Sequence, residues 1–128
     1  MRLWAEQLIV HLDRQRLLGQ HRECCALRGL GWGRKHSTVD YVFKHSHLKL
    51  YRYHMLVIKE MQRRGYNVDE KWRHWRYRGQ RCEPWPIDAF EDDSRRGAVI
   101  YPEHNETYLE ECLQNLRYKG VVIQFHFS

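Results

Sequence analysis

Apolar residues recur at three- and four-residue spacing in three stretches of this chain, which is the spacing of the buried face of a helix. The pattern predicts helices over residues 14–28, His47–Arg64 and Glu103–Tyr118. The buried face of the first helix is predicted to carry Leu17, Leu18, His21, Cys24 and Cys25. The inward residues of the other two are Leu50, Tyr53, Val57 and Met61, and Leu109, Cys112, Leu113 and Leu116. These elements predict an all-α fold, a compact three-helix bundle with long irregular loops.

Residues at the predicted helix ends suit those positions. Asp13 is the expected N-cap of the first helix, and Leu12 can pack onto Leu17 across its first turn. Gly65 follows the second helix, where a left-handed C-terminal residue is common. Pro102 suits the first turn of the third helix.

Residues 66–100 form a long connection that contains glycine, proline and little periodicity. Loops of this length in small domains are more often functional than idle. Within it, residues 71–78 (Lys-Trp-Arg-His-Trp-Arg-Tyr-Arg) alternate cations with aromatic rings. Two interpretations stay open: phosphate contact combined with base stacking, or tryptophans packed into the core with arginines facing water. The tail Val121–Phe127 alternates like a strand or covers the core, and Phe125 and Phe127 could reach a ligand.

The 128 residues fit a single domain, 1–128, that is long enough to bury a core. No apolar run approaches the length of a membrane span and no signal peptide is recognised, so we expect a soluble, cytoplasmic protein without a membrane partner. The formal net charge of +6 favours a polyanionic partner, because lysine and arginine side chains that neutralise phosphates release bound counterions.

The cysteines do not have the spacing of a zinc site or a disulfide framework. Cys24 and Cys25 are adjacent, and no C-x-x-C pair occurs. His36, His45 and His47 could be metal ligands, but surface or hydrogen-bonded histidines are the more common case. We therefore expect reduced thiols, no metal and no cofactor.

Glu23 is the only acidic residue between Asp13 and Asp40, in a segment that is otherwise cationic. On a helix over residues 14–28, no basic residue lies three or four positions away from it, so the usual ion pair of a surface glutamate is missing. Glu23 would face away from the buried stripe, beside the small residues Gly19 and Ala26. It is either a solvated charge or a catalytic carboxylate at a polyanion-binding surface.

These residues resemble the pyrimidine-dimer DNA glycosylase/abasic-site lyase family, the phage endonuclease V-like enzymes. The resemblance is carried by Gln15 through Arg22-Glu23, by Arg34-Lys35-His36 and by Arg64-Gly65-Tyr66-Asn67. Tyr101-Pro102-Glu103-His104 is a looser match, and a bacterial sub-family that begins Met-Arg-Leu-Trp is nearer still.

The resemblance implies a DNA-repair glycosylase that also cuts abasic sites in damaged double-stranded DNA. Members use the N-terminal α-amine as the nucleophile of a Schiff base, which makes Met1 the nucleophile here and Glu23 the acid/base. An α-amine suits this role because its pKa near 7.7–8.0 leaves part of it neutral at physiological pH. The implied DNA contacts are Arg2, Gln15, Arg16 and Arg22 near the lesion, Arg28, and Arg34, Lys35 and His36 on the flanking backbone.

The sequence departs from the family pattern at several of these positions. The family exposes a threonine by removing its initiator methionine, whereas Arg2 here favours retention of Met1. The family's histidine after Gln15 is Arg16, and its arginine three residues past the glutamate is Ala26, with Arg28 as a substitute. Val121–Ser128 replaces an aromatic and basic tail, which favours a monomer.

Two other functions are compatible with the same residues. A non-catalytic DNA- or RNA-binding module would keep the fold and the cationic face without the chemistry. A helix-turn-helix protein ranks third, because Gly29–Gly33 is a poor tight turn between two helices.

Overall fold

The computed structural model describes residues 2–34, 38–87 and 99–123, and within these ranges the chain is helical and contains no strand. Three α-helices, α1 (Arg14–Arg28), α2 (His47–Arg63) and α3 (Glu106–Tyr118), confirm the predicted all-α fold with long loops. Three short 3₁₀ helices, which the apolar pattern did not predict, are η1 (Glu6–His11), η2 (Asp40–Lys44) and η3 (Glu70–Arg73).

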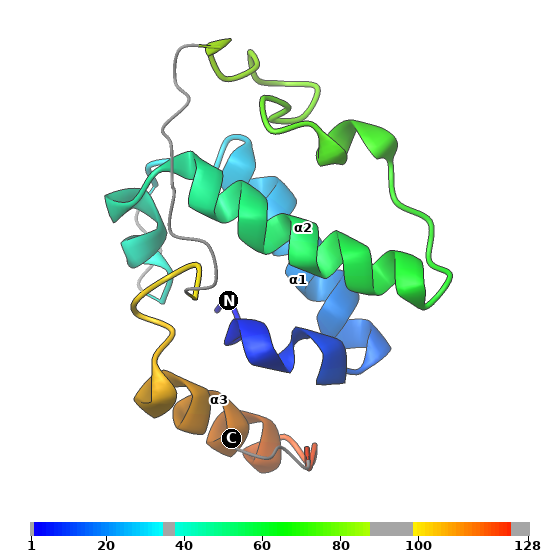
Figure 1. Ribbon diagram of the computed structural model, residues 1–128, viewed down its shortest axis with the longest axis vertical. Helices are drawn as coiled ribbons and strands as arrows, with labels where there is room; N and C mark the ends of the chain where they lie inside the picture. The colour runs from blue at the N-terminus through cyan, green and yellow to red at the C-terminus, as the bar shows by residue number, and fades with distance from the viewer. Residues whose placement is uncertain (1, 35–37, 88–98, 124–128) are drawn as a thin grey trace.

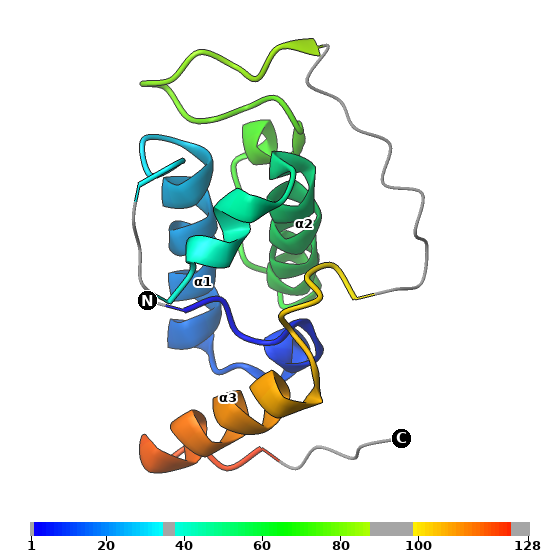
Figure 2. The same cartoon turned by 90° about the vertical axis from the view of Figure 1, so that its left-hand side faces the viewer.

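Helices α1 and α2 lie side by side, and α3 lies across one end of the pair (Figures 1 and 2). The N-terminal segment with η1 runs between this pair and α3 in both views. The loop over residues 66–87 begins beside the start of α1, where Arg14 lies over the Tyr66 ring, and runs along the pair to the end opposite α3. One end of the α1–α2 pair is therefore covered by α3 and η1, and the other end by the loop.

The helix ends follow their capping residues. Asp13 caps α1, where its side chain accepts a hydrogen bond from the Arg16 backbone N–H at 3.4 Å. α3 begins three residues later than predicted because Asn105 is its N-cap and accepts from the Tyr108 N–H at 2.9 Å. Pro102 consequently lies in the preceding turn rather than inside the helix.

The buried face of α1 is rotated relative to the prediction. The fully buried residues are Leu17, Gln20, Cys24 and Leu27, at spacings of three and four residues, followed by Arg28. The predicted members Leu18, His21 and Cys25 are only half-buried. The prediction failed because it assigned the stripe to apolar and sulfur-containing residues, whereas the fold buries a glutamine and an arginine through hydrogen bonds.

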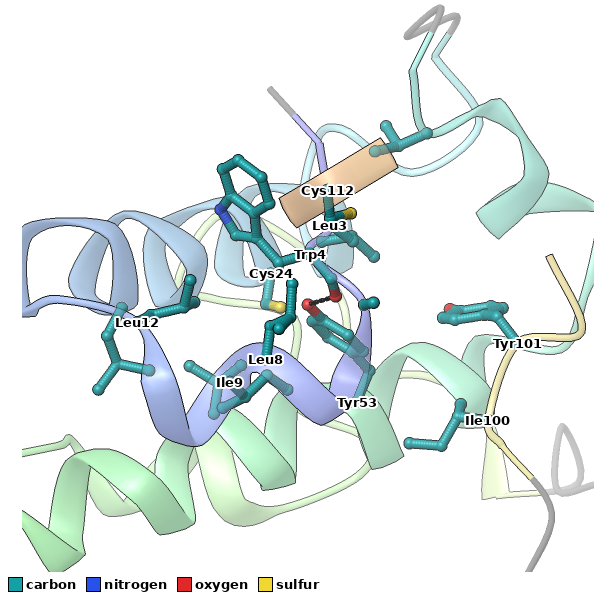
Figure 3. Packing of buried hydrophobic residues seen from close by; sticks show 14 of the residues in the cluster. Leu3, Trp4, Leu8, Ile9, Leu12, Cys24, Tyr53, Ile100, Tyr101 and Cys112 are labelled. Carbon is teal, nitrogen blue, oxygen red and sulfur yellow. Dashed lines mark hydrogen bonds between the residues drawn. The ribbon is translucent and has the colours of Figure 1, made fainter. Parts of the chain in front are cut away.

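The N-terminal segment supplies the centre of the core (Figure 3). Leu3, Ala5 and Leu8 are completely buried and Ile9 is 1% exposed. The Tyr53 hydroxyl of α2 donates to the Trp4 carbonyl oxygen at 2.5 Å, the dashed line in Figure 3. The first residues of the chain are thus packed between helices and fixed at the backbone.

Arg28 holds the loop over residues 66–87 against the end of α1. Its side chain is 2% exposed, and its guanidinium donates to the carbonyl oxygens of Trp72, His74 and Tyr77, each at 2.7 Å. Arg28 was predicted to contact DNA, but these bonds occupy it inside the protein. The side chain therefore has a structural role in place of the expected DNA contact.

Arg78 makes the reciprocal connection from the loop to the helix. Its guanidinium donates to the carbonyl oxygens of Arg28 at 2.9 Å and Gly29 at 3.2 Å, which pairs carbonyls that a helix end leaves free. A Cβ on Gly29 would lie 2.8 Å from the Arg78 carbonyl oxygen, so only glycine permits this approach.

The tryptophans of the cationic and aromatic loop pack against the protein. Trp72 lies under the Arg28 guanidinium at 5.1 Å and meets the Tyr77 ring edge to face at 4.8 Å. Trp75 stacks with His47 of α2 at a centroid distance of 6.1 Å. For these rings the packing interpretation is the one observed, while Lys71 and Arg73 are exposed.

Residues at the C-terminal end cover the core. Val121 and Ile123 pack against the hydrophobic cluster. For these two residues, the expectation that the tail covers the core is confirmed. Phe125 and Phe127 lie outside the described residues.

Replacing Arg28 should destabilise the fold. Arg28→Met keeps the length of the side chain but removes the donor from three part-buried hydrogen bonds, so we expect a loss of about 2–4 kcal/mol in the free energy of unfolding. Urea unfolding followed by tryptophan fluorescence measures the change. Arg73→Met, at an exposed position whose ion pair with Glu70 spans 3.8 Å, is the matched control and should change stability by less than about 0.5 kcal/mol. A loss below 1 kcal/mol for Arg28→Met would contradict the role given to its guanidinium.

Candidate functional site

Gln20 fixes the start of the chain to α1. Its side-chain N–H donates to the Arg2 carbonyl oxygen at 3.0 Å, and its oxygen accepts from the Trp4 backbone N–H at 2.7 Å. The Tyr53 hydroxyl lies 2.7 Å from the same oxygen and shares its one proton between this oxygen and the Trp4 carbonyl. Gln20 is only 1% exposed, so both ends of its amide are satisfied within the core and the segment has one register on the helix.

A second set of contacts holds the segment from the side of α3. The Tyr108 hydroxyl donates to the Leu3 carbonyl oxygen. His104 stacks on the Tyr108 ring at 4.7 Å and is hydrogen-bonded to the Tyr41 hydroxyl. Burial raises the pKa of Tyr108, so its hydroxyl stays protonated and keeps donating.

Glu23 lies one helical turn beyond Gln20 on α1, and its side chain is half-exposed. Within the part of the chain that the structure describes, its carboxylate has no hydrogen-bond or ion-pair partner. Arg22 and Ala26 beside it are exposed, as expected, whereas Gly19 is buried. Glu23 is therefore an accessible carboxylate three positions along α1 from Gln20, the residue that anchors the start of the chain.

The other predicted site residues are spread along the whole length of α1, from the N-terminal segment and the first turn of the helix to the glycine-rich turn that follows it. Arg2 is half-buried with its guanidinium over the Trp4 ring at 5.6 Å, and Gln15 is exposed. Arg16 pairs with Asp13 at 3.0 Å, and Arg34 is exposed after the glycine-rich turn. Met1, Lys35 and His36 lie outside the described residues.

Sequence reasoning missed the three residues that position the start of the chain: Gln20, Tyr53 as a donor, and Tyr108. A signal for Gln20 exists, because it falls between Leu17 and Cys24 on the helical stripe, and a polar residue at a buried position normally makes hydrogen bonds. The two tyrosines give no comparable signal, because their acceptors are backbone carbonyls far away in the sequence.

A polar cluster of His21, Cys25 and His54 lies on the other side of α1. His21 Nδ1 is 2.8 Å from His54 Nε2, and the Cys25 Sγ is 3.7 Å from His21 Nε2 and 3.9 Å from His54 Nε2. These ligand atoms all lie within 4.8 Å of one another, so the cluster has the residue types and spacing of a metal site.

Arg28 makes the cluster a hydrogen-bond chain instead. Its Nη1 lies 3.0 Å from His54 Nδ1, and a guanidinium can only donate, so Nδ1 must accept and Nε2 carries the proton that bonds His21. A metal on His54 Nε2 would need that nitrogen unprotonated and would face the nearby cation. Burial also raises the pKa of Cys25 to about 12, which disfavours the thiolate that binds metals.

Comparison with known proteins identifies the family. The family model described as pyrimidine dimer DNA glycosylase matches residues 1–74, and the chain belongs to this family. No curated protein and no solved structure matches the chain. The match covers the N-terminal segment, α1 and α2, the elements that carry Glu23 and its surroundings.

Among the described helices, none combines the length and the apolar composition needed to cross a bilayer.

The buried histidines should make stability depend on pH. Burial lowers the pKa of His21, His54 and His104, for His104 to about 4, and the Arg28 cation lowers the first two further. The unfolded chain takes up these protons below a pH of about 6.5, so folding stability is full above that pH and falls towards pH 4. Each histidine contributes a slope of up to about 1.4 kcal/mol per pH unit.

His54→Gln tests this dependence, because glutamine can still accept from Arg28 and donate to His21. Thermal and urea unfolding between pH 7.5 and 4.5 should show a shallower decline for this variant than for the natural chain. His11→Gln, at an exposed position, is the control and should leave the decline unchanged. Equal slopes for all three chains would contradict the assignment of buried neutral histidines.

Proposed function

We propose that this protein is a DNA-repair glycosylase with abasic-site lyase activity, in which the α-amine of Met1 is the nucleophile and Glu23 the acid/base. The observation that carries the proposal is the Gln20 amide, which fixes Arg2 and Trp4 one helical turn from Glu23. Family membership supports pyrimidine-dimer DNA as the class of substrate.

Chain geometry supports a meeting of the amine with the carboxylate. Fewer than two residues separate the α-amine from the fixed Arg2 carbonyl, and an extended chain spans about 7 Å over that length. Side chains three positions apart on a helix, as Gln20 and Glu23 are, lie about 5–6 Å apart. The amine can therefore reach the Glu23 carboxylate without any movement of the helix.

The chemistry begins with the neutral amine. Its nitrogen attacks C1′ of the damaged nucleotide, a C–N bond forms, and the glycosidic bond breaks with its electron pair leaving on the base, which is then protonated. The C1′–O4′ bond then opens, O4′ takes a proton, and C1′ is left as a Schiff base with the amine.

Glu23 would serve the second half of the reaction. A carboxylate beside C1′ stabilises the positive charge that develops on the sugar and then on the Schiff base. It can next accept a proton from C2′, whereupon the electron pair forms the C2′–C3′ double bond and the 3′ phosphate leaves. That β-elimination cuts the strand, and hydrolysis of the Schiff base frees the amine. Glu23 is half-exposed and has no hydrogen-bond or ion-pair partner among the described residues, which suits this work.

Cationic residues around Glu23 would bind the phosphates of the double-stranded substrate. We assign Arg2, Gln15, Arg16 and Arg22 to contacts near the lesion, and Arg34, Lys35 and His36 to the flanking backbone. Arg28 is left out of this set because its guanidinium is occupied by the loop. The protein would act as a monomer.

Borohydride trapping on DNA with an abasic site tests the nucleophile. The natural chain should form a covalent adduct, because borohydride reduces the Schiff base to a stable amine. An extension of two residues before Met1 moves the amine and should abolish the adduct, and peptide mapping should find the modification on Met1. An adduct that persists on a lysine, or no adduct with the natural chain, would overturn the lyase proposal and leave salt-sensitive DNA binding as the function.

Glu23→Gln tests the acid/base. The variant should still bind DNA, while strand cutting at an abasic site falls by about 10²–10⁴-fold. Glu110→Gln, at an exposed position of α3, is the matched control and should cut as the natural chain does. Unchanged cutting by Glu23→Gln would show that another group takes the C2′ proton.

Gln20→Leu separates positioning from folding. It removes the bonds to Arg2 and Trp4 but keeps the bond between Tyr53 and the Trp4 carbonyl, so we expect a folded protein that is about 1–3 kcal/mol less stable. Strand cutting at saturating DNA should fall at least tenfold, since small displacements of a reacting group are costly. Gln62→Leu, on the exposed side of α2, is the control. Full cutting by folded Gln20→Leu would argue against the anchored amine.

A further inference from the structure

A groove begins one helical turn beyond Glu23. Ala26, three positions after Glu23 and therefore about 4.5 Å further along the helix axis, is exposed and lines it. The groove has a volume of about 700 Å³ and lies between the end of α1 with the turn that follows, residues 25–34, and the loop over residues 69–82. The family match ends at residue 74, so a large part of this wall lies beyond the matched segment.

The far wall of the groove is fixed before any ligand arrives. Arg28 and Arg78 join the loop to α1 through hydrogen bonds at 2.7–3.2 Å, and Gly29 permits the close backbone approach. The Arg78 guanidinium also lies over the Trp85 ring at 4.1 Å. A loop held in this way loses little conformational freedom on binding, which favours affinity.

The charge of the lining is positive. Arg34, Arg78 and Arg81 line the groove, against the single carboxylate of Asp69, which accepts from the Lys71 N–H. Arg78 is committed to the helix end, but Arg34 and Arg81 make no ion pair within the described ranges of the chain. Two guanidinium groups that are unpaired among the described residues therefore line one groove.

Apolar side chains also line the groove. Leu30 is 55% exposed, and the half-buried rings of Trp72 and Tyr77 form part of the opposite wall. A groove that is lined by an exposed leucine as well as by arginines suits a ligand that alternates phosphates with less polar sugars. A small inorganic anion would leave this apolar surface uncovered.

We propose that this groove binds the sugar–phosphate backbone of a DNA strand beside the reacting nucleotide, with Arg34 and Arg81 on its phosphates and Leu30 against a sugar. The proposal rests on the proposed function for its choice of DNA as the polyanion. It adds the loop over residues 75–82 to the DNA-binding surface and extends the path of the strand from Glu23 past the end of α1.

The salt dependence of DNA affinity measures how many DNA phosphates the protein neutralises. Each phosphate neutralised adds about 0.9 to the slope of log affinity against log salt. When one contact is removed, the fold loss of DNA affinity between 50 and 200 mM salt should therefore be about 3.5 times smaller. We expect this change for Arg34→Ala and for Arg81→Ala, and about 12-fold for the double variant, on undamaged and abasic duplexes alike.

Lys59→Ala is the control for net charge. Lys59 is an exposed cation on α2 that does not line the groove, so its removal should leave the slope unchanged. A slope for Arg81→Ala equal to that of the natural chain, or an equal reduction for Lys59→Ala, would overturn the groove proposal.

Leu30→Glu tests the groove without removing a cation. The side chain is exposed, so the fold should tolerate the change, while the new carboxylate repels phosphates and should weaken DNA binding at least tenfold at low salt. Leu56→Glu adds the same charge at a 38% exposed position of α2 and should have a much smaller effect. Equal effects of the two substitutions would overturn the proposal.

The failure of this proposal can be told apart from the failure of the proposed function. Strand cutting at saturating DNA should be retained in Arg81→Ala and Leu30→Glu, because these residues bind the strand away from the reacting sugar. If trapping with borohydride succeeds but the slopes do not change, only the groove is wrong. If no adduct forms but the slopes change as expected, the groove binds DNA and the lyase chemistry is wrong.

Discussion

One buried amide determines how the start of this chain is placed. Gln20 occupies a position on α1 where the helical stripe calls for an apolar residue, and it uses both ends of its amide on the backbone of residues 2–4. If the buried amide had no partners, the fold would lose about 1–3 kcal/mol of stability. The N-terminal segment and the Gln20 side chain therefore stabilise each other. Packing of Leu3 and Leu8 fixes the segment in the core, but the amide fixes its register.

Much of the fold was readable from the sequence, because the three helices rest on apolar spacing and on caps such as Asp13. The buried face of α1 was not, because Gln20 and Arg28 are buried through partners far away in the sequence. At the candidate site, Glu23 stands out in the sequence by its isolation among cations, and its catalytic role stays a prediction. The DNA contact predicted for Arg28 was wrong, because neither the charge of a residue nor the family pattern reveals whether its guanidinium faces solvent or bonds to three carbonyls.

Polar anchors recur wherever a chain segment without regular structure meets the bundle. Gln20 binds the N-terminal segment, Tyr108 binds it again from α3, and Arg28 binds the loop over residues 66–87. Segments of this kind cannot satisfy their own backbone groups, so buried side chains must do so. The described interior accordingly includes a glutamine, an arginine, histidines and tyrosines among its leucines.

Gln20 and Arg28 stand eight positions apart on α1, about 12 Å along its axis, and share no partner. Substitutions around sites so separated usually have independent effects. Changes in the loop are therefore expected to leave the hydrogen bonds of Gln20 unaltered, and with them the register of the N-terminal segment. Variation in the loop would then alter what this end of the molecule can bind without altering how the start of the chain is held.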